Sequence, residues 1–389
     1  MKKKLTLMFL PFILILSTVS SVFAEEKAPS LQLAAKAASA VLLDRDTGTV
    51  IFEKDAHKPL PPASITKIMT MLLIMEALER GELNLKDMVS TSEYAASMGG
   101  SQIFLKPGEE MSVDEMLKGI AIASGNDASV AMAEHMAGTE EAFVEKMNKR
   151  AKELGMKETT FKNTNGLPAE GHVSSAYDIA IMSRELLKHE EITKYTGTYQ
   201  DYLRKGSESP FWLVNTNKLV RFYQGADGLK TGFTNEARYC LSATAKKGNM
   251  RIVAVVMGEP DSKTRNAEVT SMLNYAFTHY ASFPLYKENQ MISMVKVEKG
   301  KLDKVAAVIP YNFSLLLKKG EKVSQYQKFV EIDPDVSAPI KKGQKIGSVV
   351  VKKHGKLVTT VDLVSADSVE KAHWWDLWKR TSRKMFGGE

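Results

Sequence analysis

The sequence is poor in cysteine and has no clustered histidines, and each shortage removes a class of protein. Cys240 is its only cysteine, so the chain cannot form an internal disulfide, and its strand-like setting predicts a buried core thiol. The seven histidines show no His-Glu-x-x-His or clustered ligand spacing, which removes most support for a zinc peptidase. His172, in the loop 171–174, is expected to be solvated or to cap a helix. We expect no metal ion.

Long apolar runs are scarce as well. The run from Leu5 to about Leu16 is too short for a confident transmembrane span. It follows three lysines and precedes the small-residue site Val22-Phe23-Ala24. This pattern is typical of a signal peptide over residues 1–24, so we expect an exported protein that begins near Glu25.

The formal net charge of +7 is unevenly distributed along the chain. Residues 286–389 hold 20 Lys and Arg against 12 Asp and Glu, so the basic character belongs to the C-terminal part. The lysines there are scattered along alternating segments without interleaved aromatic residues. This favours a solvated or membrane-facing surface, and we expect no nucleic acid as a partner.

The order of strand-like and helix-like segments predicts an α/β (α+β) fold. Two strands joined by the turn 44–48 come first, and helical patterns dominate from residue 113 to about 187. Strands return near 211–219 and then at 228–234, 238–245 and 250–258, followed by an amphipathic helix. We expect an antiparallel sheet with an inserted helical subdomain over residues 25–282. Residues 283–366 alternate like a small all-β domain, and 367–389 form a separate tail.

One apolar helix begins with a possible nucleophile and a possible base. Pro61 and Pro62 end any preceding element, and the run that starts at Ser64 is apolar on nearly every face up to Glu76. Residues three apart share a helix face, so the Lys67 amine can reach the Ser64 hydroxyl. A second Ser-x-x-Lys, at Ser293, lies in a strand-like segment where the two side chains point to opposite faces. Burial singles out Ser64, because a buried lysine is costly unless it is paired or neutral, and a neutral lysine is a base.

Two further polar sites interrupt apolar surroundings. Ser124-Gly125-Asn126 is expected to be a tight loop between two helices. Lys230-Thr231-Gly232 is expected on the strand after an Asp227-Gly228 turn, where the glycine leaves room for a close approach. Each triplet alone is more simply a helix cap or a strand end. Together with Ser64 and Lys67, in this order, they are a strong signal.

The order Ser-x-x-Lys, Ser-x-Asn, Lys-Thr-Gly resembles the penicillin-recognising serine enzymes. Ser-Gly-Asn at the second motif, Asp227-Gly-Leu-Lys-Thr-Gly-Phe-Thr and the trailing β domain are similar to the low-molecular-mass D-alanyl-D-alanine carboxypeptidases, and among them to a sporulation enzyme. The resemblance extends from about Ala35 to the C-terminus. It implies removal of the terminal D-alanine from peptidoglycan stem peptides, with β-lactam antibiotics as inhibitors. The reaction implied in this way needs no metal and no organic cofactor.

The resemblance also implies a role for each motif residue. Ser64 would be the acylated nucleophile, Lys67 its base, and Ser124 a proton relay toward the leaving amine. The substrate would be bound by the remaining motif residues, with an oxyanion hole formed by the backbone N–H groups of Ser64 and Phe233. These substrate-binding residues are Asn126, Lys230, Thr231, Gly232, Phe233 and Arg265, of which Arg265 falls where the family places an arginine near the terminal carboxylate.

Departures from related patterns leave two alternatives open. Gly125 replaces the aspartate of a class A β-lactamase, and no convincing deacylating glutamate follows between residues 155 and 187, so fast penicillin hydrolysis is not expected. Transpeptidation would use the same site with an amine acceptor. A non-catalytic cell-wall-binding protein would have no need to keep Ser64, Lys67, Ser124, Asn126 and Lys230 intact.

The tail from Ser368 to Phe386 holds three of the four tryptophans. Wound as a helix, it places Trp374, Trp375 and Trp378 on one side and its basic residues on the other. We expect a membrane-associating amphipathic helix that keeps the enzyme on the outer face of the cytoplasmic membrane. The alternative is a helix packed on the β domain.

Overall fold

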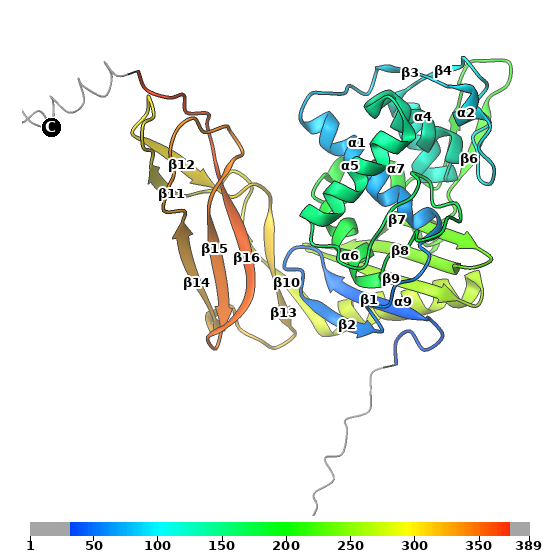
Figure 1. Ribbon diagram of the computed structural model, residues 1–389. Coiled ribbons are helices and arrows are strands. Elements are labelled where there is room, and N and C mark those ends of the chain that lie inside the picture. Colours follow the sequence, from blue (N-terminus) through cyan, green and yellow to red (C-terminus); the bar gives the residue numbers. More distant parts are fainter. Residues whose placement is uncertain (1–31, 374–389) are drawn as a thin grey trace, which may run out of the picture. The chain divides into compact units, whose positions relative to one another are not determined.

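The computed structural model describes residues 32–373, and its N-terminal part is built on a five-stranded antiparallel sheet (Figure 1). The strand order is β2-β1-β9-β8-β7, so the first hairpin lies beside the last strand of a later meander. The strands are β1 (Ser39–Asp44), β2 (Val50–Lys54), β7 (Ala226–Thr234), β8 (Arg238–Lys247) and β9 (Met250–Glu259). The helices of the inserted subdomain lie in the sequence between β2 and β7, and a further helix follows β9.

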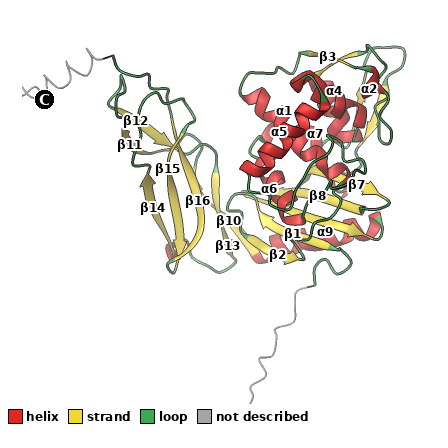
Figure 2. Ribbon diagram, viewed as in Figure 1, coloured by secondary structure: helices red, strands yellow, loops and turns green. Residues whose placement is uncertain are grey.

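Both faces of this sheet are covered, and the alternation of side chains along β9 shows how. Val253 and Val255 belong to the large core under the helical subdomain. Ile252, Ala254 and Val256 point the other way, into a core closed by α9 (Ser262–His279). Figure 2 shows the helices on the two sides of the sheet. The predicted α/β architecture with an antiparallel sheet is confirmed.

The helical subdomain surrounds α1 (Lys67–Glu79), which follows a 3-10 turn over Ala63–Thr66. Nine of its thirteen residues are buried, because apolar side chains cover almost its whole circumference. The other helical segments up to β7 are α2 (Glu93–Ala96), α3 (Val113–Lys118), a π-helical turn (Gly119–Ala123), α4 (Asn126–Ala137), α5 (Glu140–Glu153), α6 (Ala176–Leu186), a 3-10 turn (Glu190–Ile192), α7 (Thr193–Thr196) and α8 (Leu219–Phe222). Two short hairpins accompany them: β3 (Met88–Ser90) with β4 (Glu110–Ser112), and β5 (Gln200–Leu203) with β6 (Phe211–Val214).

Two sequence expectations are corrected here. The Asp227-Gly228 turn does not exist, because β7 already begins at Ala226 and pairs with β8 through a bulge between Ala226 and Gly228. The strand expected over 211–219 ends at Val214, and Leu219 instead begins the single turn α8.

The C-terminal part is all β, as predicted, and has its own apolar core. One sheet has the order β11-β12-β16-β15-β14, and β10 pairs with β13 in a separate ladder. The strands are β10 (Tyr280–Tyr286), β11 (Met291–Lys296), β12 (Lys304–Val308), β13 (Phe313–Lys318), β14 (Tyr326–Ile332), β15 (Lys345–Lys353) and β16 (Lys356–Ser365), with a 3-10 turn at Val323–Gln325. The predicted boundary between residues 282 and 283 falls inside β10. Ser293 and Lys296 lie in β11, as expected of a Ser-x-x-Lys without a catalytic role.

The start of the predicted tail helix is wrong. Val369 is buried and forms a bridge with Ile340, and Lys371 forms one with Gly300. Residues 368–373 are therefore extended chain tied to the β domain. The rest of the predicted helix, with its tryptophans, lies outside the described residues. Among residues 32–373, no helix has the length and the apolar content needed to cross a bilayer.

Candidate active site

Ser64 lies in the 3-10 turn (Ala63–Thr66) that directly precedes α1, and not in α1 itself. Ala63, directly before it, has a φ of +48°, a conformation that a residue with a Cβ rarely adopts. The turn is packed from two sides by glycines. A Cβ on Gly166 would lie 1.8 Å from the Ala63 carbonyl oxygen, and one on Gly232 would lie 2.9 Å from that of Pro62. Neighbouring backbones thus hold the Ser64 turn in a strained form, as is common at catalytic residues.

The Lys67 amine has three oxygen partners. Its Nζ lies 3.0 Å from Ser64 Oγ, 2.6 Å from Asn126 Oδ1 and 2.7 Å from the Asn165 carbonyl oxygen. The predicted approach of Lys67 to Ser64 is confirmed, and the structure adds two acceptors from distant parts of the chain. The Lys67 side chain is fully buried.

Burial favours the neutral form of Lys67. Removal from water holds the pKa of the Lys67 amine well below its usual range, and the Lys230 charge lowers it further, against an opposing effect of Asp127. A neutral amine has two N–H donors and one lone pair. The two shorter contacts, to Asn126 and Asn165, take the two donors. In this neutral form the lone pair can accept the hydroxyl proton of Ser64, whereas in the ammonium form Nζ also donates to Ser64 Oγ.

Ser124 and Asn126 occupy the predicted loop between two helical segments. Ser124 has a left-handed backbone (φ 66°, ψ 31°) that turns the chain from the π-helical turn into α4. The Asn126 side chain spans two neighbours, because its Oδ1 accepts from Lys67 while its Nδ2 donates to the Gly99 carbonyl at 2.7 Å. These two bonds place the amide oxygen of Asn126 toward Lys67 and its amide nitrogen toward Gly99.

The third motif lies on β7, against the Ser64 turn. Lys230 is buried and donates to the Thr231 carbonyl at 3.0 Å. The Thr231 hydroxyl donates to Thr216 Oγ1 at 2.7 Å. Gly232 is needed where it stands, because β7 passes so close to the Pro62 carbonyl that a Cβ would not fit. Phe233, one residue further on, is half exposed, with 51% of its surface accessible.

Arg265 lies in the first turn of α9 and is 5% exposed. Its guanidinium donates to Asn266 Oδ1 through Nε and Nη2. Burial lowers the pKa of Lys230, and the positive charge of Arg265 lowers it further, to about 7. The two cations therefore act on each other, which fits the prediction that both face one anionic group.

Sequence reasoning missed several residues that support this site. The Asn165 carbonyl left no signal, because a backbone oxygen is present at every position. Asp127 accepts from the backbone N–H groups of Ile103 and Leu105 and so holds the loop between α2 and β4 beside the Ser-Gly-Asn motif. In the sequence, only the position of Asp127 directly after Asn126 could have indicated this supporting role.

The expectation for His172 was wrong, because its ring is buried rather than solvated, with 5% exposed. Its Nδ1 accepts from the Lys162 backbone N–H at 3.1 Å, and its Nε2 lies 2.8 Å from Thr66 Oγ1. Burial and the nearby charge of Lys162 lower the pKa of His172 to about 4. The imidazole is therefore neutral at physiological pH.

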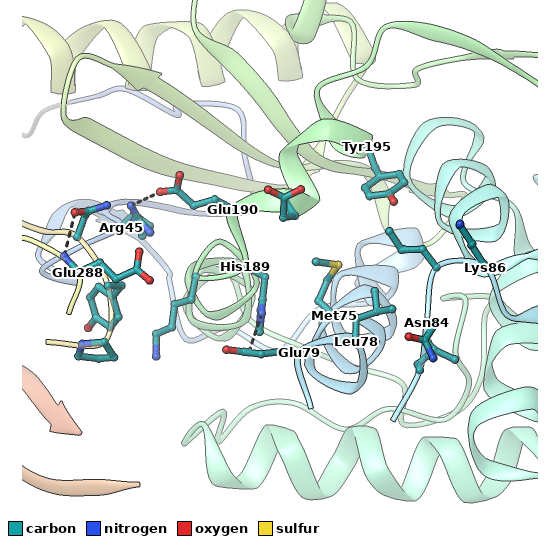
Figure 3. A pocket seen from close by; sticks show the side chains of 17 residues that line it. Arg45, Met75, Leu78, Glu79, Asn84, Lys86, His189, Glu190, Tyr195 and Glu288 are labelled. Atoms are coloured by element: carbon teal, nitrogen blue, oxygen red, sulfur yellow. Dashed lines mark hydrogen bonds and ion pairs between the residues drawn. The ribbon is translucent and has the colours of Figure 1, made fainter. Parts of the chain in front are cut away.

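Two cavities lie near these elements. One of about 410 Å³ adjoins the Ser64 turn and is lined by Pro62, Ala63, the loop 166–173 and Thr234. A larger one of about 1100 Å³ lies at the other end of α1, where Figure 3 shows the ion pair of Arg45 with Glu190 and the contact of His189 with Glu79. None of the nine predicted site residues lines either cavity, although the smaller one adjoins the Ser64 turn, so cavity size alone would have pointed away from the chemistry.

No metal site accompanies these residues in the described part of the chain, where no three His, Cys, Asp or Glu side chains come close enough to hold an ion.

Two family models match this chain. The one described as D-alanyl-D-alanine carboxypeptidase matches residues 24–261, and the one described as penicillin-binding protein 5, C-terminal domain, matches residues 280–371. Each catalytic motif falls inside the first match except Arg265, which lies just after it.

Curated and solved relatives agree with these matches. The chain is 55% identical over 380 residues to the D-alanyl-D-alanine carboxypeptidase DacF of Bacillus subtilis, covering 97% of this chain and 98% of that protein. It is 32% identical over 361 residues to DacC of Escherichia coli, covering 89% and 88%. The crystal structure of penicillin binding protein 5 from Haemophilus influenzae superposes with a TM-score of 0.67 at 32% identity, covering 86% of this chain and 98% of that one. The resemblance to the D-alanyl-D-alanine carboxypeptidases inferred from the motifs is confirmed.

Proposed function

The chain belongs to the D-alanyl-D-alanine carboxypeptidase family of serine peptidases, and from that premise we propose that its reaction runs through an acyl-enzyme on Ser64 with neutral Lys67 as the base. The observation that carries this proposal is the set of contacts around Lys67 Nζ. Its two N–H groups are engaged by Asn126 and Asn165, and its remaining contact, at 3.0 Å, is Ser64 Oγ.

In the acylation step, Ser64 Oγ attacks the carbonyl carbon between the two D-alanines while its proton passes to Lys67 Nζ. The carbonyl oxygen becomes an oxyanion, which the backbone N–H groups of Ser64 and Phe233 stabilise. The C–N bond then breaks, and the amine of the terminal D-alanine leaves with a proton relayed through Ser124. Water hydrolyses the Ser64 ester and restores the hydroxyl.

Recognition of the substrate is assigned to β7 and α9. The terminal carboxylate is bonded by the Thr231 hydroxyl and neutralised by Lys230 and Arg265, whose mutual repulsion falls when an anion lies between them. Gly232 leaves space for the substrate backbone, and the Asn126 amide binds the peptide. Peptidoglycan stem peptides ending in D-Ala-D-Ala are the substrates, and penicillins acylate the same serine.

Intact-protein mass spectrometry with benzylpenicillin tests the assignment of Ser64. One stoichiometric adduct is expected on the wild-type chain, and Ser64→Ala should give none while keeping its circular dichroism spectrum. Ser293→Ala, in the second Ser-x-x-Lys, is the matched control and should be labelled like the wild type. An adduct on the Ser64→Ala chain would transfer the role to another residue.

We propose further that the protein is exported and held on the outer face of the cytoplasmic membrane by its C-terminal tail. The support lies in the sequence: a signal-like segment over residues 1–24 and the basic, tryptophan-rich stretch from Trp374 to Phe386. Use of the enzyme during sporulation also stays a prediction.

Flotation with vesicles of an anionic phospholipid tests the tail. The shortened chain should end at His373, because a cut after Ala366 would also remove Val369, which is buried in the β domain. The mature protein should float with the vesicles and the shortened chain should not, while both hydrolyse soluble peptides equally. Equal flotation of the two would refute the anchor.

A further inference from the structure

His172 and Thr66 form a hydrogen-bond chain that ends on the backbone of the Ser64 turn. The Thr66 hydroxyl donates to the Ala63 carbonyl oxygen at 2.8 Å. Since its proton is used there, Thr66 Oγ1 can only accept from His172 Nε2–H, at 2.8 Å. The other ring nitrogen, Nδ1, accepts from the Lys162 N–H. One tautomer of the neutral imidazole therefore satisfies every bond.

The carbonyl at the end of this chain belongs to the peptide unit that joins Ala63 to Ser64. A trans peptide is planar, and its C=O and N–H point in opposite directions. Fixing the Ala63 oxygen therefore also fixes the direction of the Ser64 N–H. That N–H is one of the two donors assigned above to the oxyanion hole.

The same peptide unit needs such support, because its conformation is strained. Ala63 has a positive φ of 48°, which an alanine adopts at a cost in energy. Gly166 packs directly on this unit, since a Cβ there would lie 1.8 Å from Ala63 O and 2.8 Å from Ser64 N. Packing limits where the peptide can lie, and the Thr66 bond sets how it is rotated.

We propose that His172 is a positioning residue for catalysis, acting through Thr66 to aim the Ser64 N–H at the developing oxyanion. His172 does not exchange a proton with the substrate in this role. His172 should therefore stabilise the transition state, which carries the oxyanion. It should affect substrate binding little, because the bound substrate has no oxyanion. The inference rests on the proposed oxyanion hole.

Variants that differ by one hydrogen-bonding group test this chain of bonds. Thr66→Val removes the hydroxyl at nearly constant shape, and Thr66→Ser keeps it. Loss of one oxyanion donor costs about 10²–10³ in kcat, and a misdirected donor should cost part of that. We expect Thr66→Val and His172→Phe each to lower kcat on a D-Ala-D-Ala peptide by roughly 10- to 100-fold with KM little changed, and Thr66→Ser to stay near the wild type.

A peptide boronic acid separates this role from a merely structural one. Its tetrahedral adduct with Ser64 places an oxygen in the hole, so its affinity should fall by about the same factor as kcat/KM. Substrate affinity measured in a Ser64→Ala background should not change. Phe161→Leu, which removes the ring packed edge-on against His172 at 6.0 Å but leaves both hydrogen bonds, is the matched control for lost stability.

Because His172 acts through Thr66, the double variant Thr66→Val/His172→Phe should be no slower than Thr66→Val alone. Three results would overturn the inference: a kcat loss in the double variant equal to the product of the two single losses, an unchanged boronate affinity in Thr66→Val and His172→Phe, or equal kcat losses in Thr66→Ser and Thr66→Val. If His172→Phe does not fold, the two Thr66 variants still decide it. If the wild type forms no boronate adduct at Ser64, the proposed function fails instead.

Discussion

Replacing Lys67 by arginine tests whether a neutral lysine is the base. An unperturbed lysine, with a pKa near 10.4, would be neutral in roughly one molecule in 2,500 at pH 7. Burial and the charge of Lys230 hold the pKa of Lys67 well below this value, which favours the neutral form. A guanidinium stays protonated throughout the accessible pH range, so it has no lone pair for the Ser64 proton.

The expected loss follows from the contribution of general base catalysis, about 10²–10⁴ in rate. Acylation by a fluorescent penicillin, followed by stopped flow, should slow by this factor in Lys67→Arg. Raising the pH to 10 should not restore it. The wild-type rate should not climb tenfold per pH unit between 7 and 9, as it would with an ordinary lysine.

A guanidinium is larger than an ammonium, and Lys67 is fully buried, so folding must be checked by circular dichroism. Lys67→Met, which has no charge to bury, serves as the second variant. Lys118→Arg is the control, since Lys118 forms a surface ion pair with Asp114 at 2.6 Å. Acylation within threefold of the wild type in a folded Lys67 variant would refute the lysine-base mechanism.

Three further predictions concern charge near the site. The pKa of Lys230 is lowered to about 7, and its amine must be charged to hold the substrate carboxylate. The kcat/KM for D-Ala-D-Ala peptides should therefore fall as the pH rises through about 7. A flat profile from pH 6.5 to 8.5 would contradict this. Arg265→Ala should lower kcat/KM on these peptides by about tenfold or more, because a charged hydrogen bond is lost. Lys263→Ala, on the same helix, is the control and should not lower it. Unchanged catalytic efficiency of Arg265→Ala would remove Arg265 from the site. His172 has a pKa of about 4 in the folded chain against 6.5, so the unfolded state binds more protons between these values. The free energy of unfolding should therefore fall by roughly 3 kcal/mol from pH 6.5 to 4 relative to His172→Phe, measured by urea denaturation, and parallel curves would show that His172 is not buried and neutral.

The sequence by itself determined the local geometry of the nucleophile and the order of the motifs. Ser64 and Lys67 are three residues apart at the start of an apolar helix, and helical geometry alone brings them together. Amphipathic and alternating patterns also predicted the sheet, the inserted helices and the β domain, because they record which side chains face a core.

Only the tertiary structure decided the protonation state of the base and the support of the turn. The pKa of Lys67 is lowered because the packed helices and loops bury its amine completely and because Lys230, on β7, adds a second positive charge. Its contacts with Asn126 and Asn165, 59 and 98 residues away, also arise only from this packing. One of these acceptors is a backbone carbonyl, which no residue type identifies. His172 was taken for a solvated loop residue because its partner, Thr66, is 106 positions earlier. Contacts of this range depend on how helices and loops pack, and packing is not encoded in any local pattern.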